Sequence, residues 1–170
     1  MANQRVLVAY GSTNQGTAGI AEEIAATLGK EGLTAEARPA AEIGDLAAYD
    51  AVVLGGGLYA GRWHRDARRL VRRLRAPLRD RPVWFFSSGP LDASATEKDI
   101  PPARGVRRAM SRVTARGHVT FGGRLAPYPK GRLARSMAKR GMAHDWRDFD
   151  QVQAWARAVA AELHERGRSQ

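Results

Sequence analysis

Residues 5–17 read RVLVAYGSTNQGT, a short apolar run that passes directly into a turn rich in glycine and hydroxyl side chains. A continuous apolar run of this length is typical of a strand buried on both faces of a sheet. Residues 18–30 then repeat apolar side chains at helical spacing, which predicts an amphipathic helix. A strand, a glycine turn and a helix in this order predict the first unit of a parallel α/β sheet.

The same alternation of strand and helix patterns continues along the chain. Four more strands are predicted at residues 34–38, 49–55, 82–87 and 118–122, and helices at residues 64–78, 106–115, 132–139 and 148–165. Asp148 is the predicted N-cap of the last helix, with Gln151 as its capping-box partner. The pattern predicts an α/β fold in one domain over residues 1–170, a flavodoxin-like doubly wound, five-stranded parallel sheet of order 2-1-3-4-5 with helices on both faces.

Composition excludes several classes of protein. The chain has 170 residues, 44% of them hydrophobic, which is enough for one domain with a substantial core. It has no cysteine, so disulfides, thiolate catalysis and cysteine-ligated metals are excluded. No apolar run approaches the roughly 18 residues of a membrane span, and the start of the chain does not have the pattern of a signal peptide. We therefore expect a cytoplasmic protein.

The charge is strongly basic. There are 28 lysines and arginines against 17 acidic residues, a net charge of +11, and 24 of the basic residues are arginines. A basic surface suits nucleic acid, anionic lipid or a polyanionic substrate. The simpler interpretation, solvated helix faces, is favoured here because the arginines are spread along the chain. Specific binding of nucleic acid is not expected.

The turn at residues 11–17 has the chemistry of a phosphate site. It offers hydroxyl groups, free backbone N–H groups and the positive end of the following helix dipole. It contains no lysine or arginine, and it matches neither a Walker loop nor the G-x-G-x-x-G pattern. A phosphate held by hydroxyls and amides alone is typical of a mononucleotide. The alternative is an ordinary capped connection between strand and helix.

Two further loops follow predicted central strands, and ligands bind at the carboxyl ends of such strands. Residues 55–63 read GGGLYAGRW: glycine lets the backbone approach a flat ligand closely, and Tyr59 and Trp63 could stack on its ring. The alternative for Trp63 is that it packs at the start of the following helix. The third loop begins at Ser87, and its free amides could bind the polar edge of a heterocycle. One loop for a phosphate and two for a flat ring predict a site for flavin mononucleotide (FMN).

The predicted cofactor-binding residues are Ser12, Thr13, Asn14, Gln15, Gly16 and Thr17 in the first loop, Gly56, Gly57, Leu58, Tyr59, Ala60 and Gly61 in the second, and Ser87, Ser88, Gly89 and Pro90 in the third. No metal site and no catalytic residue is predicted. His64 and His118 have the chemistry of acid–base catalysts, but the sequence shows no partner for either, so both are predicted to be structural.

Five segments spread over nearly the whole chain form a recognisable set. They are Thr17-x-x-x-Ala21 in the first loop, LGGGLYAG at residues 54–61, FFSSGP at 85–90, VTFGGRL at 119–125 and DWRDFD at 145–150. The set resembles the flavodoxin family, and within it the branch that includes menaquinone-dependent protoporphyrinogen dehydrogenase. The resemblance implies a flavodoxin-like fold, bound FMN, and oxidation of protoporphyrinogen IX with a quinone as acceptor.

The chain departs from that family in two ways. The family usually places a glycine two residues before the loop threonine, where this chain has Gln15, so the turn is expected to be reshaped. The resemblance also implies that flavodoxins of the electron-shuttle type are acidic and dock on basic partners. A chain with a net charge of +11 would repel such partners.

We therefore expect an FMN-binding oxidoreductase. The rivals are a non-enzymatic electron carrier with a basic docking face, and a module that has lost its flavin and uses its charge to bind nucleic acid. The long loop at residues 88–105 is more than a carrier requires, which favours the enzyme. The expected partners are a small redox substrate or a quinone, with a redox protein and a second copy of the chain left open.

Two basic segments are interpreted as contact sites. The segment that contains Arg104, Arg107, Arg108 and Arg112 is predicted to receive either substrate carboxylates, with which arginine pairs bidentately, or anionic lipid. The helix near Leu133 and Met137 is flanked by Arg132, Arg135, Lys139 and Arg140. It either touches an anionic bilayer peripherally, at the inner face of the membrane, or only closes the edge of the sheet.

Overall fold

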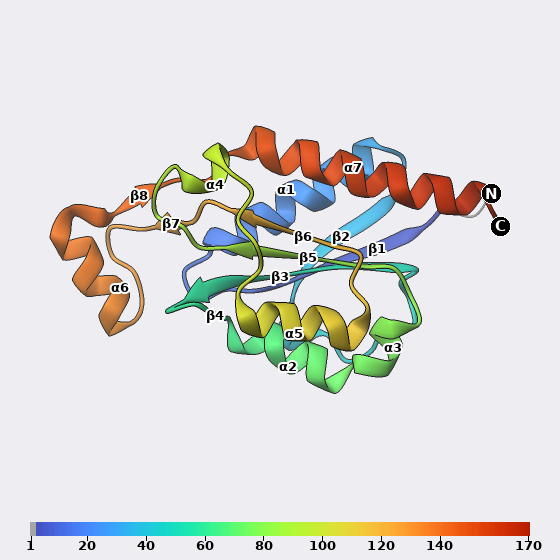
Figure 1. Cartoon of the computed structure of the whole chain (residues 1–170), viewed down its shortest axis with the longest axis horizontal. Helices are drawn as coiled ribbons and strands as arrows, with labels where there is room; N and C mark the ends of the chain where they lie inside the picture. Colours follow the sequence, from blue (N-terminus) through green and yellow to red (C-terminus); the bar gives the residue numbers. More distant parts are fainter. Residues whose placement is uncertain (1–2) are drawn as a thin grey trace.

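The computed structural model describes residues 3–170. Its main sheet has five parallel strands in the order β2-β1-β3-β5-β6, and a short strand β4 pairs antiparallel with the end of β3 (Figure 1). The strands are β1 (Arg5–Gly11), β2 (Thr34–Pro39), β3 (Ala51–Tyr59), β4 (Arg62–Trp63), β5 (Val83–Ser88) and β6 (Gly117–Phe121). Counted without β4, this is the order 2-1-3-4-5, so the predicted fold class is confirmed.

Helices cover both faces of the sheet. α1 (Gly16–Lys30) and α7 (Phe149–Arg168) lie on one face, and α2 (Arg65–Arg73), α3 (Arg75–Arg79) and α5 (Arg104–Val113) lie on the other (Figure 1). Alternate residues of each buried strand belong to two separate hydrophobic cores. Val6 and Val8 pack with α1 and α7, whereas Leu7 and Ala9 belong to the core on the opposite face of the sheet. Both faces of the strands are therefore buried, as their continuous apolar sequence indicates.

Strand β3 corrects the predicted boundaries. It begins at Ala51 and does not stop at residue 55: it runs through the three glycines to Tyr59, turns at Ala60 and Gly61, and returns as β4. Part of the predicted second loop is thus a β-hairpin. The hairpin was not apparent from the sequence because glycine is uncommon inside strands.

The predicted helix at residues 64–78 is two helices. α2 ends at Arg73 and α3 begins at Arg75, with Leu74 between them at φ −114° and ψ 30°. Pro77 accounts for the break, because it has no N–H to donate to the carbonyl of Arg73 and its ring would clash with that carbonyl.

The last helix begins as predicted but is capped differently. The Asp148 side chain accepts hydrogen bonds from the N–H groups of Asp150 and Gln151, which confirms the N-cap. The Gln151 side chain does not complete a capping box: its Nε2 donates instead to the carbonyl of Ala95, in the short helix α4 (Ser94–Glu97). This contact fastens the long loop after β5 to α7.

The segment after β6 forms a small outlying unit at the end of the molecule where the parallel strands terminate (Figure 1). β7 (Arg124–Leu125) pairs antiparallel with β8 (His144–Asp145). Between them lie α6 (Arg132–Met137) and a π-helical turn at Ala138–Met142. A 3₁₀ turn, η1 (Ala40–Glu42), follows β2. Within the described residues, no helix combines the length and the apolar character needed to cross a bilayer.

Candidate functional site

A cavity of about 300 Å³ lies beyond the carboxyl ends of β1, β3 and β5. Ten predicted residues line it: Ser12, Asn14, Gly16, Thr17, Gly57, Leu58, Tyr59, Ala60, Ser88 and Gly89. The structure therefore brings residues from all three predicted loops to one place. A wider hollow of about 1030 Å³ lies at the opposite end of the sheet, between the amino ends of the strands and the end of α7. Ligands of open α/β sheets bind at the carboxyl end, so the first cavity is the candidate site.

The first loop presents polar groups that are available to a ligand. The hydroxyls of Ser12 and Thr17 make no hydrogen bond to any other residue in the range 3–170, although Thr17 is buried. Helix α1 begins at Gly16, and its first amides have no partner within the helix. Hydroxyls, free amides and the positive helix end together form a cradle for a phosphate.

Gln15, at the position where the resemblance implies a glycine, has an unusual backbone conformation. It has φ 64° and ψ 0°, in the left-handed region where a side chain is strained. A non-glycine residue therefore occupies a conformation that favours glycine at this position, and a turn reshaped relative to the family stays a prediction.

Replacing Gln15 with glycine should stabilise the protein. Glycine adopts this conformation without strain, and after its greater loss of chain entropy we expect a net gain of about 0.5–1 kcal/mol in the free energy of unfolding. Chemical denaturation measures it. Ala26→Gly on the exposed side of α1 is the matched control, expected to lose about 1 kcal/mol. A loss of stability in Gln15→Gly would contradict the strain argument.

The second loop leaves an open slot next to the first. A Cβ at Gly57 would lie 3.2 Å from the Thr17 hydroxyl and 3.2 Å from that of Tyr59, so glycine keeps the space between them free. Tyr59 lines the cavity and is 40% exposed. Trp63 is buried, stacks against Phe85 and donates its indole N–H to the carbonyl of Phe86, so the prediction that it could stack on a ligand is wrong.

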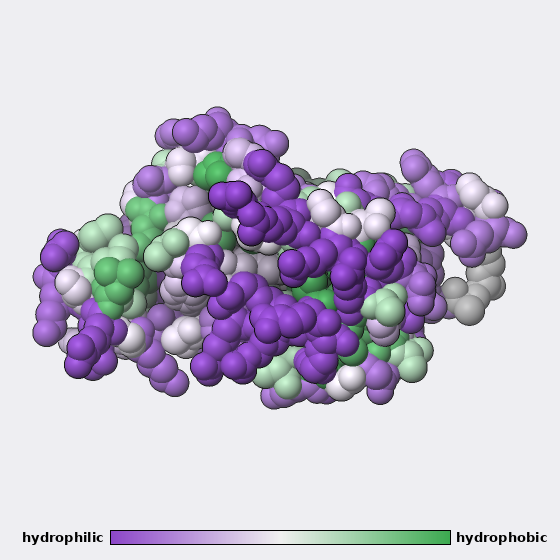
Figure 2. Space-filling model, turned by 60° about the horizontal axis from the view of Figure 1, so that its bottom comes forward, coloured by the Kyte–Doolittle hydropathy of each residue, from purple (hydrophilic) through white to green (hydrophobic). Residues whose placement is uncertain are grey.

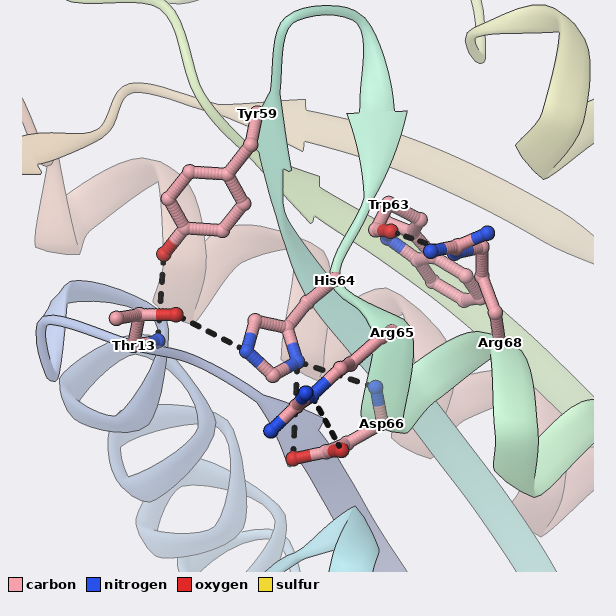
Figure 3. A network of polar contacts seen from close by, with 7 residues as sticks. All are labelled: Thr13, Tyr59, Trp63, His64, Arg65, Asp66 and Arg68. Atoms are coloured by element: carbon pink, nitrogen blue, oxygen red, sulfur yellow. Dashed lines mark hydrogen bonds and ion pairs between the residues drawn. The ribbon is translucent and has the colours of Figure 1, made fainter. Parts of the chain in front are cut away.

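A polar network joins the two loops (Figure 3). The N–H of Thr13 donates to the Tyr59 hydroxyl at 3.3 Å, and the Thr13 hydroxyl lies 3.1 Å from Nε2 of His64. Nδ1 of His64 accepts from the N–H of Asp66 and so caps α2. Thr13 is thus held between the hairpin and the start of α2, which fixes the first loop against the second.

The tautomer of His64 follows from these contacts. Because Nδ1 accepts a hydrogen bond, the proton of the neutral ring lies on Nε2 and is donated to the Thr13 hydroxyl. Burial lowers the pKa of His64, and Arg65 and Arg68 add to this effect, whereas Asp66 opposes it. The ring is therefore neutral at pH 7, and the Thr13 hydroxyl keeps its own proton to donate elsewhere.

Six predicted residues do not line the cavity: Thr13, Gln15, Gly56, Gly61, Ser87 and Pro90. Two of them are excluded by strand geometry, since neighbouring residues of a strand face opposite sides of the sheet. Gly57 and Ser88 face the cavity, whereas a Cβ at Gly56 would meet Trp63, and Ser87 contacts His118. From the sequence, Gly56 is predicted to lie in a loop and Ser87 at the junction of a strand and a loop, where no such alternation is expected.

His118 belongs to the sheet and not to the cavity. Its Nε2 lies 2.9 Å from the hydroxyl of Ser87 on the neighbouring strand. Burial lowers its pKa from 6.5 to about 4, and Asp99 only partly opposes this. Its place agrees with the structural role predicted for it.

The depressed pKa of His118 makes stability depend on pH. The unfolded chain takes up the proton near pH 6.5 and the folded chain only near pH 4, so the free energy of unfolding falls as the pH drops through that window. Allowing for partial exposure, we expect a loss of about 2 kcal/mol. Urea denaturation at pH 7.5 and pH 4.5 measures it. His118→Gln, which keeps a hydrogen-bonding side chain but does not titrate, should flatten the profile, and an unchanged profile would contradict this account.

Several cavity residues were not predicted. Leu91, Gly123, Arg124 and Leu125 line it from the loop after β5 and from the start of β7, and Leu133, Ala134 and Met137 line it from α6. The VTFGGRL segment could have indicated Gly123 and Arg124. The α6 residues could not be found in this way, because nothing in the sequence shows that α6 folds back over the carboxyl end of the sheet.

The basic segment at residues 104–112 lies elsewhere. Arg104, Arg107, Arg108 and Arg112 belong to α5 and do not line the cavity. They are therefore not part of the cavity wall, and a contact with substrate carboxylates or anionic lipid stays a prediction. Arg124 is the cationic side chain among the residues that line the cavity.

Comparison with known proteins defines the class. A family model described as the flavodoxin domain matches residues 7–151, most of the chain. The chain therefore belongs to the flavodoxin domain family. A comparison with curated proteins gave no significant match.

Solved structures share the fold at low sequence identity. A point mutant of flavodoxin from Pseudomonas aeruginosa superposes with a TM-score of 0.64 at 16% identity, over 94% of this chain and 99% of that one. A short-chain flavodoxin associated with a non-canonical PDU bacterial microcompartment gives 0.61 at 12% identity, over 94% and 98%. Rubredoxin oxygen:oxidoreductase from Desulfovibrio gigas gives 0.63 at 11% identity over 95% of this chain, which spans only 36% of that protein.

The site fits the cofactor of this family. Unpartnered hydroxyls at a helix N-terminus suit a phosphate, and the glycine-lined slot beside Tyr59 suits a flat ring. Family membership and this geometry both support FMN as the cofactor. No group of three or more His, Asp or Glu side chains among residues 3–170 is arranged to hold a metal ion.

Proposed function

We propose that the protein is an FMN-dependent oxidoreductase that binds its cofactor in the 300 Å³ cavity. The observation that carries this proposal is the convergence in one cavity of the free hydroxyls of Ser12 and Thr17, the N-terminus of α1 and the slot kept open by Gly57. FMN supplies the redox chemistry when bound. The chain binds it, orients it and excludes water from it.

Each part of the cavity has a role in this proposal. Ser12 and Thr17 donate to phosphate oxygens, and the amides at the start of α1 add to the same cradle. Tyr59 flanks the flat ring, and the backbone at Ser88 and Gly89 meets its polar edge. Thr13 holds the first loop in place through Tyr59 and His64.

The second reactant is proposed to be a quinone. α6 contributes an apolar wall to the cavity, and its Leu133 is 63% exposed at the surface, beside the exposed Arg132 and Arg135. Hydrophobic residues are exposed at this end of the molecule in Figure 2. An apolar side chain set among basic ones suits a brief contact with an anionic bilayer, where quinones are dissolved.

Stopped-flow mixing of the reduced protein with menadione tests the quinone proposal. We expect fast, saturable reoxidation, slowed at least tenfold in Leu133→Glu when both proteins are compared fully loaded with FMN. Met142→Glu, which adds the same charge at an exposed residue outside the cavity lining, is the matched control. Slow reoxidation by the quinone combined with fast exchange with redox proteins would favour the electron carrier instead.

The narrower proposal, oxidation of protoporphyrinogen IX, depends on the resemblance of the five sequence segments. Here Arg124 takes the role predicted for the α5 arginines, because it lies in the cavity wall and could pair with a propionate of the substrate. Arg124→Gln should raise the KM for protoporphyrinogen IX several-fold. A protein that reduces quinones but does not oxidise this porphyrinogen would overturn the narrower proposal and leave the general one standing.

A further inference from the structure

The positive charge of the protein is gathered on one face. α2 and α3 carry seven arginines and one acidic residue, and α5 carries four arginines and no acidic residue. Together they hold a net charge of +10 out of the +11 of the whole chain. The arginine face consists of Arg65, Arg68, Arg69, Arg72, Arg73, Arg75, Arg79, Arg104, Arg107, Arg108 and Arg112.

These arginines form one continuous surface. α5 packs beside both α2 and α3 on the same side of the sheet (Figure 1), so two segments that are distant in sequence become neighbours. Figure 2 looks toward this side and shows hydrophilic side chains across its middle. All of these arginines except the half-buried Arg68 are exposed.

The charges on this face are almost unpaired. Within the part of the chain that the structure describes, only Arg65 of this set has an acidic partner within 4.0 Å, Asp66 at 3.7 Å. Arginines four residues apart repeat along both helices, as in Arg65 with Arg69 and Arg104 with Arg108. Like charges at this spacing destabilise a helix by a few tenths of a kcal/mol per pair, about 0.2–0.5. An anionic surface laid over this face would relieve that repulsion.

The arginine face adjoins the mouth of the cavity. The β3–β4 hairpin places Tyr59 in the cavity wall, α2 begins two residues after the end of β4, and α5 contacts β4. A partner seated on α2 and α5 would therefore lie beside the hairpin that flanks the proposed flavin. The position of the partner beside the flavin rests on the proposed function. The unpaired charge of the arginine face does not rest on it.

The side chains of the arginine face indicate which class of partner it binds. The exposed large hydrophobic residues found in the structure, Tyr59, Tyr128, Leu133 and Met142, all lie outside α2, α3 and α5, so the face has nothing to insert into a bilayer. These helices also contain no aromatic residue, Asn or Gln that could stack on or read bases. Guanidinium groups match carboxylates bidentately. We propose that the arginine face docks a protein with an acidic surface.

Calorimetry with an acidic plant-type [2Fe–2S] ferredoxin as the probe tests this proposal. We expect micromolar affinity at 20 mM NaCl that weakens at least tenfold at 300 mM, since exposed charges are screened by salt. Arg69→Glu/Arg72→Glu/Arg108→Glu should weaken binding at least tenfold more than Arg157→Glu/Arg166→Glu/Arg168→Glu. The second variant makes the same change of charge on α7. Basic cytochrome c should not bind.

Equal loss of ferredoxin binding in the two variants would overturn the docking proposal, and so would preferential binding of duplex DNA or of phosphatidylserine vesicles over ferredoxin at 150 mM NaCl. FMN affinity is measured separately for each protein, and ferredoxin binding is measured with and without FMN. Failure to bind ferredoxin with FMN affinity intact counts against docking alone. Failure of the parent protein to bind FMN counts against the proposed function alone.

Discussion

The double variant Ser12→Ala/Thr17→Ala is expected to bind FMN at least a hundredfold more weakly than the parent protein. Both hydroxyls face the cavity and have no partner among residues 3–170, so their hydrogen bonds are available to a phosphate. A hydrogen bond to a charged group contributes about 1.5–3 kcal/mol. Losing two therefore costs about 3–6 kcal/mol, which corresponds to roughly a hundredfold to ten-thousandfold in Kd. Quenching of FMN fluorescence measures the change.

The matched control deletes one serine and one threonine hydroxyl outside the cavity. Thr96→Ala/Ser111→Ala removes side chains that bond only to nearby carbonyls, of Ala93 and Arg107 respectively. FMN affinity should be unchanged in this control. Equal affinity of the cavity variant and the parent protein would contradict the assignment of the phosphate to the first loop.

Two glycines of β3 should respond in opposite ways to the same substitution. Gly55 and Gly57 lie on the same face of the strand, but a Cβ at Gly55 would collide with the Phe86 ring, whereas a Cβ at Gly57 would enter the slot between Thr17 and Tyr59. Gly55→Ala should overpack the core and lower the free energy of unfolding by about 3 kcal/mol. For a chain of this size, that lowers the Tm by roughly 6–12 °C.

Gly57→Ala should leave most of that stability intact and instead weaken FMN binding at least tenfold, because the new methyl group occupies space meant for the ligand. Thermal denaturation without cofactor and FMN titration together separate the two effects. Gly44→Ala is the neutral control, since no atom lies within 4 Å of a Cβ placed there. A stable Gly55→Ala protein, or a Gly57→Ala protein with full FMN affinity, would show that β3 is positioned differently.

Much of the fold could be predicted because the strands and helices are strongly patterned. The first loop was also located correctly, since a strand, a glycine turn and a helix fix where a helix N-terminus lies. The hairpin was missed because Gly55, Gly56 and Gly57 give no strand pattern. Gly55 and Gly56 pair with both β1 and β5, and Gly57 pairs with β5. As a result, no pattern in the sequence distinguishes Gly57 and Ser88, which face the cavity, from Gly56 and Ser87, which face away.

The concentration of positive charge on one face of the molecule also could not be predicted from the sequence. Along the chain the arginines look dispersed, and each helix by itself resembles an ordinary solvated surface. Their concentration appears only when α5 packs beside α2 and α3. The α6 wall of the cavity was missed for the same reason: it depends on a contact between segments that are distant in sequence, which no local pattern records.

The central claim is that the cavity binds FMN, and titration of FMN with the purified apoprotein tests it most directly. The account predicts quenching of flavin fluorescence with one FMN bound per chain, and a clear preference for FMN over FAD, since no further residues of the first loop are placed for an adenosine. Flavin fluorescence that stays unchanged at micromolar protein, or a preference for FAD, would contradict it.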